Sequence, residues 1–418
     1  MGAPRSPLMP LDDALAALIS AAKPWSEQEK LATLDADGRV LAADLMSGLQ
    51  VPAFDNSSMD GYAVRVADVL PAGAVLQVTQ RIAAGQQGEP LKAGQAARIF
   101  TGAPMPAGAD AVVMQEECEV LDLNGSPHVR LLKTPVPGEW VRRSGEDVQE
   151  GCVVLSRGQR LGPAELGLAA SLGLAHLPVV RRPRVALFST GDELVMPGEV
   201  EPGMMRPGAI YNSNRFFLRA LLNRLGCEVS DLGIVPDRRD ATVAALKSAA
   251  DHHDLILTSG GVSVGEEDHV KPAVQSLGAL ALWQISMKPG KPFAFGHLRR
   301  TKSSELAYFV GLPGNPVSSF MTYVLLVRPF LLALQGARPQ PLRPWRVQAH
   351  FSVDKPDRRR EFLRVRRNAQ GGLDLFQNQS SAVLTSVVWG DGVIDLPAGQ
   401  TVRHGDLVDF LPFSEWLT

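Results

Sequence analysis

The 418-residue sequence contains only three cysteines, Cys118, Cys152 and Cys227. They are far apart and odd in number, so they can form neither a disulfide framework nor a Cys-x-x-Cys metal site. The eight histidines form no His-x-x-His pair, and we therefore do not expect a catalytic zinc ion with three histidine ligands. A reducing cytosol is the compartment that fits this composition.

The sequence also lacks a strong net charge, a leader peptide and a membrane-spanning run. Its formal net charge of -2 gives no general attraction to nucleic acid or to anionic membranes. Asp12 and Asp13 interrupt the region where a signal peptide needs an apolar core. Residues 309–327 carry no charge, but two prolines and a glycine predict a loop followed by a buried helix. We expect a cytoplasmic protein that binds small anionic ligands.

The sequence does contain the patterns of a folded protein with several domains. Hydrophobic residues make up 45% and charged residues 21%, which is typical of soluble proteins. Leucines at helical spacing predict an opening helix over residues 11–18, and short β-prone runs predict a small β-rich domain over about residues 51–141. From residue 184, strands alternate with helices, which predicts a parallel sheet with helices on its faces. Short β runs after Pro341 predict a C-terminal β domain.

Three predicted strands of the α/β section end in polar loops, at residues 189–193, 236–237 and 258–265. Ligands of parallel sheets bind at such strand ends. Glycines in the third loop would let backbone amides approach an anion. The loop is neither a Rossmann fingerprint nor a Walker loop, and a plain glycine-rich turn explains it equally well when it is taken alone.

Two further segments place cations or free amides where an anion could bind. Lys288 and Lys291 flank a Pro-Gly turn and could converge on an oxyanion, although lysines on an exposed turn are more often simply solvated. In the segment GLPGNPVSSF, two prolines fix a rigid loop before a helix that begins near Val317. A helix N-terminus presents free amides to an anion.

Arginines crowd the segment RRREFLRVRR, residues 358–367. In a regular strand Leu363 and Val365 would face one side, while Arg364 and Arg366 would face the other. For Arg366 and Arg367 a solvated basic face is the favoured interpretation.

The segment VPAFDNSSMDGYAV, residues 51–64, crowds short polar side chains before Gly61. Such residues favour turns through local hydrogen bonds, so a turn is the simplest interpretation. Its carboxylates, Asp55 and Asp60, are nevertheless candidates for a site.

Seven segments occur together in one order: VPAFDNSSMDGYAV, FTGAPMP, RRSGEDV, ALFSTGDEL, TSGGVSVGEEDH, KPGKPFAFG and GLPGNPVS. Together they resemble the molybdopterin molybdenumtransferase family, which includes the bacterial MoeA proteins and the E domain of gephyrin. The resemblance covers almost the whole chain. It is looser in the C-terminal part, where Ala382 follows Ser381 at a position that is frequently basic in the family.

The resemblance implies a multidomain α/β plus β fold. Its centre is a three-layer α/β molybdopterin-binding domain with a parallel-rich sheet, accompanied by a protruding β-rich domain, an N-terminal connecting domain and a C-terminal β-barrel-like domain. The implied boundaries are residues 1–51 with 141–183 for the connecting domain, 52–140 for the protruding domain, 184–333 for the α/β domain and 334–418 for the C-terminal domain.

The resemblance further implies that the protein takes molybdate and adenylylated molybdopterin, inserts molybdenum, and releases AMP with the help of Mg²⁺. The implied catalytic residues are Asp60, Thr101, Asp147, Glu193, Asp237, Asp268, Lys288 and Lys291. The implied ligand-binding residues are Ser259, Gly260, Gly261, Ser263, Gly265, Pro313, Gly314, Asn315, Pro316, Arg364 and Ser381. Asp237, Asp268 and Glu193 are the metal candidates, and Arg359 is an alternative to Arg364 for molybdate.

The resemblance also implies a homodimer in which Asp55 and Asp60 overhang the cleft of the neighbouring subunit and complete its site. Other proteins of molybdenum cofactor biosynthesis are possible partners. Two alternatives remain open: adenylylation of molybdopterin by ATP, and a gephyrin-like scaffold that binds a partner peptide. The additional β domains favour molybdenum insertion over adenylylation.

Overall fold

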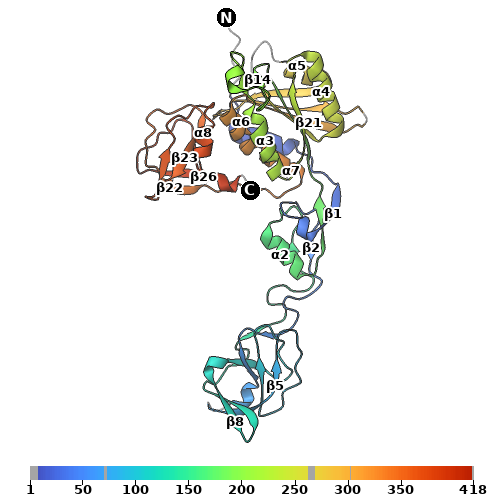
Figure 1. Ribbon diagram of the computed structural model, residues 1–418, viewed down its shortest axis with the longest axis vertical. Helices are drawn as coiled ribbons and strands as arrows, with labels where there is room; N and C mark the ends of the chain where they lie inside the picture. The colour runs from blue at the N-terminus through green and yellow to red at the C-terminus, as the bar shows by residue number, and fades with distance from the viewer. Residues whose placement is uncertain (1–7, 70–72, 262–268, 302, 417–418) are drawn as a thin grey trace.

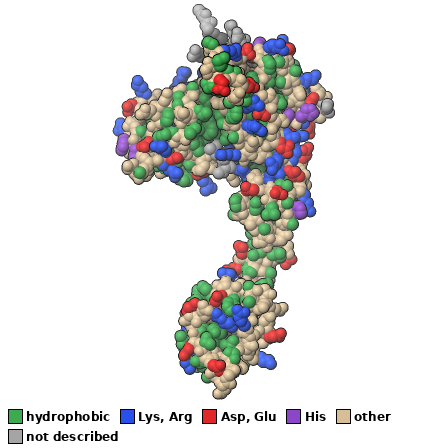
Figure 2. All heavy atoms as spheres, in the orientation of Figure 1, with side chains coloured by type: hydrophobic (Ala, Val, Ile, Leu, Met, Phe, Trp, Pro, Cys, Tyr) green, Lys and Arg blue, Asp and Glu red, His purple; other side chains and the backbone are tan. Residues whose placement is uncertain are grey.

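The chain forms an elongated molecule in which a large body and a small lobe are joined by a narrow stalk (Figures 1 and 2). The computed structural model describes residues 8–69, 73–261, 269–301 and 303–416. The body contains the α/β domain and the C-terminal β-rich domain, and the lobe is β-rich. The predicted multidomain fold is confirmed.

The α/β domain is built on a six-stranded sheet with the order β16-β13-β17-β21-β20-β18. The first four strands are parallel to one another. At the other edge β20 is antiparallel to β21, and β18 is antiparallel to β20. The central strands are buried because their sequences are apolar runs, as predicted for parallel sheets that are covered on both faces. The strands are β13 (Arg184–Thr190), β16 (Glu228–Val235), β17 (Leu255–Ser259), β18 (Gly278–Gln284), β20 (Pro292–Arg299) and β21 (Leu306–Leu312).

Helices cover both faces of this sheet and make a three-layer domain. Alternate residues of β13 point to opposite layers: Leu187 packs in one hydrophobic core and Phe188 in the other. One layer contains α4 (Arg239–His252) and α5 (Val270–Leu277); the other contains α1 (Leu11–Ala21), α3 (Ser213–Arg224), α6 (Pro316–Thr322) and α7 (Arg328–Leu334). The opening helix α1 therefore lies in the core of the α/β domain, against α7, and not in the stalk.

Residues 316–334 form a nearly continuous apolar helical segment that includes α6 and α7. It is long and apolar enough to cross a membrane, but 78% of its most apolar window is buried inside the protein, as in the core helix of a soluble domain. The first part of the charge-free run is the strand β21, so the loop before the helix is only residues 313–315. The prediction of a buried helix is confirmed, and the predicted loop was too long.

The stalk is built from short antiparallel pairs of strands, and the lobe from a mixed sheet that includes a parallel pair. In the stalk β1 (Gln28–Ala32) pairs with β12 (His176–Val180), β2 (Leu45–Met46) pairs with β11 (Val153–Leu155), and α2 (Pro163–Ser171) packs beside them. The lobe has a six-stranded sheet with the order β7-β4-β6-β5-β9-β8. These strands are β4 (Gly61–Val64), β5 (Val75–Ile82), β6 (Gln95–Ile99), β7 (Ala111–Met114), β8 (Cys118–Leu123) and β9 (Ser126–Leu131), and β3 (Asn56–Ser57) pairs with β10 (Val141–Arg142) at the stalk.

The C-terminal domain shares a sheet with the α/β domain. The short strand β19 (Met287–Lys288), which belongs in sequence to the α/β domain, pairs in parallel with β23 (Arg360–Arg367) of the C-terminal domain. Phe362 and Val393 of the C-terminal domain also belong to the hydrophobic core that surrounds α6 and α7. The sheet order is β19-β23-β25-β26-β22, with strands β22 (Trp345–Gln348), β25 (Gly392–Leu396), β26 (Leu407–Pro412) and β24 (Leu373–Leu375), which pairs with β23.

A buried carboxylate fastens the stalk to the body where β12 leads into β13. Asp254 is only 2% exposed and accepts hydrogen bonds from both terminal nitrogens of Arg181, at 2.6 and 3.0 Å. It also accepts the backbone N–H of Arg184 at 2.8 Å, and Arg300 lies 3.4 Å from it. The guanidinium of Arg181 stacks 4.6 Å from the ring centre of Trp25. The two segments of chain that enter the stalk are therefore held at one point of the body.

Candidate functional site

A cavity of about 580 Å³ lies at the carboxyl ends of the parallel strands, where ligands of such sheets bind. It is lined by loops that follow β13, β17 and β21, by the start of α3 and by one residue of the C-terminal domain. Six predicted site residues line it: Glu193, Ser259, Gly260, Gly314, Asn315 and Pro316. Gly261 and Pro313 are their immediate neighbours in sequence.

The loops around the cavity are tied together by buried contacts. Asn214 donates hydrogen bonds from Nδ2 to Ser259 Oγ and to the carbonyl oxygen of Gly314, both at 2.7 Å. Gly260 has φ +93, and a Cβ atom there would lie 2.9 Å from the carbonyl oxygen of Thr190. Only glycine allows this close approach of the two loops at that backbone angle.

A loop of the C-terminal domain closes one side of the cavity. Ala382 lines the cavity, and the carbonyl oxygen of the preceding Ser381 accepts the N–H of Val317 at 2.9 Å. This amide belongs to the first turn of α6, and Pro316 has no N–H to offer. The expectation that this helix start presents free amides was therefore wrong for Val317. The N-terminus of α3, which the sequence analysis did not select, also lines the cavity.

The lysine turn lies beside the C-terminal sheet, and its two lysines differ. Lys288 makes ion pairs with Glu361 at 2.8 Å and Asp357 at 3.3 Å, and these pairs raise its pKa, the contact with Glu361 contributing most. Hydrogen bonds from Arg359 hold the pKa of Asp357 well below its usual value. Among the described residues, no ion pair engages Lys291. Lys291 is therefore the lysine of this turn whose charge is available to a ligand.

Arg364 is fully buried, in contrast to the polar face predicted for it. Its guanidinium donates to Ser386 Oγ at 3.0 Å and to the carbonyl oxygens of Phe362 and Ser380, both at 3.2 Å. Burial lowers its pKa to about 10. The strand alternation failed here because β23 is covered on both faces, so that only Arg366 and Arg367 at its end are exposed. Arg364 thus holds the loop that carries Ser381.

Three predicted catalytic residues lie away from the cavity, in the lobe or at its junction with the stalk (Figure 1). Asp60 precedes β4 and accepts the backbone N–H of Thr101 at 2.8 Å and its hydroxyl at 3.0 Å. These bonds, the backbone one first, lower the pKa of Asp60. Asp147 is exposed beyond β10. Within one chain the structure does not bring Asp60, Thr101 or Asp147 to the cavity.

The candidate metal ligands are only partly described. Glu193 lines the cavity, and Asp237 follows β16 at the same edge of the sheet. Asp268, and with it Ser263 and Gly265, lie outside the described residues. Among the described residues no three His, Cys, Asp or Glu side chains form a cluster suited to a metal ion.

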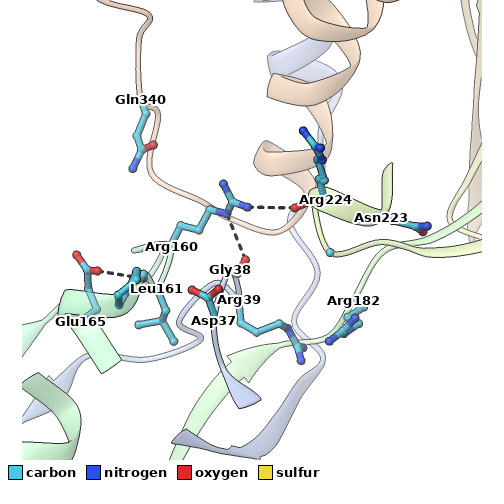
Figure 3. A pocket seen from close by; sticks show the side chains of 13 residues that line it. Asp37, Gly38, Arg39, Arg160, Leu161, Glu165, Arg182, Asn223, Arg224 and Gln340 are labelled. Carbon is cyan, nitrogen blue, oxygen red and sulfur yellow. Dashed lines mark hydrogen bonds between the residues drawn. The ribbon is translucent and has the colours of Figure 1, made fainter. Parts of the chain in front are cut away.

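A second cavity, of about 700 Å³, lies where the stalk meets the body and contains none of the predicted site residues (Figure 3). Arg160 crosses it, donating to the carbonyl oxygens of Gly38 at 3.2 Å and Arg224 at 3.4 Å. Arg39 is buried, pairs with Glu29 and donates to the carbonyl oxygen of Val180. Arg160 and Arg39 bind backbone carbonyl oxygens and a carboxylate of the protein itself. We therefore interpret this cavity as a contact region between stalk and body.

Tyr211, Asn212 and Asn214 are among the residues of the first cavity that sequence reasoning missed. The signal was present, because Asn and Ser before an amphipathic run are typical of a helix N-cap. Asn212 does cap α3, accepting the N–H of Arg215 at 3.3 Å. A strand end followed by a capped helix is also where anions and cofactors bind in α/β folds.

Family models match nearly the whole chain. They are the MoeA N-terminal region (domain I and II) over residues 9–173, the probable molybdopterin binding domain over 186–333 and the MoeA C-terminal region (domain IV) over 346–413. The molybdopterin molybdenumtransferase of Haemophilus influenzae is 38% identical over 98% of this chain and 100% of its own length. That of Bacillus subtilis is 34% identical over 94% of this chain and 91% of its own.

Solved structures of MoeA proteins have the same fold as this chain. A crystal structure of the molybdopterin biosynthesis MoeA protein from Pyrococcus horikoshii aligns with a TM-score of 0.81 and 28% identity, covering 97% of this chain and 100% of that one. A second structure of MoeA from Pyrococcus horikoshii gives a TM-score of 0.75 at 31% identity, covering 97% and 99%. With all three family regions matched in order and full-length relatives above 30% identity, the chain belongs to the MoeA family of molybdenum cofactor biosynthesis proteins.

Proposed function

We propose that this protein is a molybdopterin molybdenumtransferase that inserts molybdenum from molybdate into adenylylated molybdopterin and releases AMP. The cavity at the strand ends carries this proposal, because it joins loops of the region matched as a probable molybdopterin binding domain to a loop of the C-terminal region. The full-length relatives bear the name of this activity. The reaction would take place in the cytoplasm, where other proteins of molybdenum cofactor biosynthesis are potential partners.

The described residues suggest how the substrates are held. Ser259, Gly260 and the loop of residues 313–316 offer a hydroxyl and close backbone to the adenylylated pterin. Lys291 supplies the free cation for molybdate, with Lys288 as a neighbour whose charge two carboxylates already balance. Ser381, held by Arg364 and by its bond to Val317, lies at the edge of the same region.

Of the three metal candidates, we assign Mg²⁺ to the carboxylates of Asp237 and Asp268. Asp237 fits such a cation, because it is a carboxylate at the ligand-binding edge of the sheet. When bound, the cation would neutralise charge on the pyrophosphate group from which AMP leaves. The protein's part is to hold the substrate at the strand ends.

We also propose a homodimer in which each site takes residues from both chains. The lobe that carries Asp60 and Thr101 stands away from its own cavity at the end of the stalk (Figure 1). If these residues act in the reaction, a second chain must bring them to the cavity. The stalk gives the lobe the reach that such sharing requires.

Incubation with adenylylated molybdopterin, molybdate and Mg²⁺ tests the proposed function. We expect AMP and molybdenum-bound pterin to appear together, and omission of molybdate to stop the formation of the second product. Release of AMP without molybdenum-bound pterin, or consumption of ATP with free molybdopterin, would point to another reaction of the same pathway.

Lys291→Ala is expected to raise the molybdate concentration needed for half-maximal rate about tenfold. A charged hydrogen bond to an oxyanion contributes about 1.5–3 kcal/mol, and a tenfold change corresponds to the lower end of that range. The half-saturating concentration of adenylylated pterin should stay the same. Lys355→Ala, which removes an exposed lysine of the C-terminal domain, is the matched control. An unchanged molybdate requirement would remove Lys291 from the oxyanion site.

A further inference from the structure

The side chain of Asn212 has a fixed orientation at the start of α3. It is 2% exposed, and its Oδ1 accepts the N–H of Arg215 at 3.3 Å, which makes it the N-cap of the helix. The oxygen is therefore used by the helix. The amide nitrogen Nδ2 takes no part in this capping bond.

Nδ2 of Asn212 is a buried donor that finds no hydrogen-bond partner among the residues that the structure describes. A buried donor without a partner costs about 1–3 kcal/mol. Asn214, two residues later, is different, because its Nδ2 donates to both Ser259 and Gly314. Asn214 holds the cavity together, whereas Asn212 lines the cavity with a donor that the protein itself leaves unused.

The walls of the cavity suit a flat, uncharged ring. No lysine or arginine is among the described residues that line it, and Leu194, Ile210 and Tyr211 supply apolar and aromatic surface. The hydroxyl of Tyr211 is occupied by the carbonyl oxygen of Val200 at 2.6 Å, so only its ring is left to face a ligand. Among these described wall residues a phosphate would find no cation.

The carboxylate of Glu193 is a hydrogen-bond acceptor on the wall of the same cavity. Glu193 adjoins the two-residue ladder of β14 (Leu194–Val195) and β15 (Ile210–Tyr211), and Asn212 adjoins its other strand. Two backbone hydrogen bonds hold Glu193 and Asn212 in place. Ile210 N–H donates to the carbonyl oxygen of Glu193 at 2.8 Å, and Asn212 N–H donates to the carbonyl oxygen of Val195 at 2.9 Å. A Cβ atom at Gly191, which has φ +139, would lie 2.6 Å from the Glu193 carboxylate. Glycine therefore makes room for this carboxylate.

We propose that Asn212 and Glu193 bind the pyrimidine edge of the pterin ring. Asn212 donates from Nδ2 to the C4 carbonyl oxygen, and the carboxylate of Glu193 accepts the neighbouring N3–H and 2-amino group. Adenine has no such run of one acceptor beside two donors, so this pair selects the pterin end of the substrate over its adenylyl end. The assignment rests on the proposed function, because it takes a pterin as the substrate, and it gives Glu193 a role other than metal binding.

Asn212→Asp tests the assignment in the full-length protein. Aspartate caps a helix as well as asparagine does, but it would place a carboxylate against the pterin carbonyl. We expect pterin, titrated by its own fluorescence, to bind at least about tenfold more weakly, in line with the cost of an unpaired buried polar group. Glu193→Gln should weaken pterin binding similarly. Asn223→Asp, in the exposed last turn of α3, should leave binding unchanged, and circular dichroism should show that all three variants are folded.

A parallel titration with AMP separates the two ends of the substrate. AMP affinity should be the same in Asn212→Asp and wild type. Wild-type pterin affinity in Asn212→Asp, no measurable binding of pterin by the wild type, or a loss confined to AMP would each overturn the assignment. Failure of the wild type to form molybdenum-bound pterin, with selective loss of pterin binding in Asn212→Asp, would refute the proposed transfer reaction and leave this pterin site standing.

Discussion

Mixing two inactive variants, Asp60→Ala and Asp237→Ala, should restore about a quarter of wild-type activity. In the proposed homodimer every site combines the lobe of one chain with the cavity of the other, so each variant homodimer lacks one essential group in both sites. In the heterodimer, one site receives both defects and the other receives none. Random reassociation after joint unfolding makes about half of the dimers mixed, and half of their sites are intact. AMP release from adenylylated pterin measures the recovery.

The matched control is a mixture of Asp60→Ala with Thr101→Ala. Both residues belong to the lobe, where Asp60 accepts the hydroxyl of Thr101, so each site of this heterodimer contains one damaged lobe. No recovery is expected from that mixture. If the first mixture also stays inactive although native mass spectrometry shows heterodimers, the shared-site arrangement is wrong.

Asp254→Asn should lower the free energy of unfolding of the body by about 3 kcal/mol, a value typical of breaking a buried ion pair from one side. The substitution keeps the shape of the side chain but leaves Arg181 and Arg300 beside a neutral amide at a 2% exposed position. Asp240→Asn, which removes a partner from an exposed pair with Arg238 at 3.4 Å, should cost less than about 0.5 kcal/mol. Urea unfolding of the three proteins measures the difference, and equal midpoints would refute it.

The effect of Asp254 should depend on pH in one direction. Burial would raise the pKa of this carboxyl, but the bonds from Arg181 and Arg184 outweigh it and lower the pKa below its usual value. A carboxyl with a lowered folded pKa contributes stability above its unfolded pKa of about 4, and this contribution is lost as the pH falls through the folded pKa. The gap between wild type and Asp254→Asn should therefore be full at pH 7 and shrink in acid below about pH 4.

The overall fold could be predicted from the sequence because its patterns are periodic and local. Alternating strands and helices after residue 184 lead directly to the observed three-layer domain, and motif order leads to the family. The α1 helix shows the limit of this reasoning. Its leucines predict a helix, but nothing local says that Leu18 packs beside α7, more than 300 residues later in the chain.

The site could be predicted only where chemistry is visible in single loops. The loops that carry Glu193 and Ser259 were predicted because polar residues follow apolar strands, and the 313–316 loop because two prolines precede a predicted helix. Which groups are already satisfied depends on contacts from distant segments, so the sequence could not show that two acidic residues neutralise Lys288. For the same reason Asn212 was missed, since its unused N–H becomes visible only when its neighbours are placed.

The pairing of β19 with β23 has a consequence for the protein during its synthesis. Met287 and Lys288 find their partners at Arg360 and Glu361, about seventy residues later. At about 5–20 residues per second, the ribosome needs several seconds or more to make that stretch, and its exit tunnel delays the partners further. Until then the nascent α/β domain has an unpaired two-residue strand and an uncovered apolar face beside α6. Truncated chains that end before residue 360 should therefore need a chaperone to stay in solution.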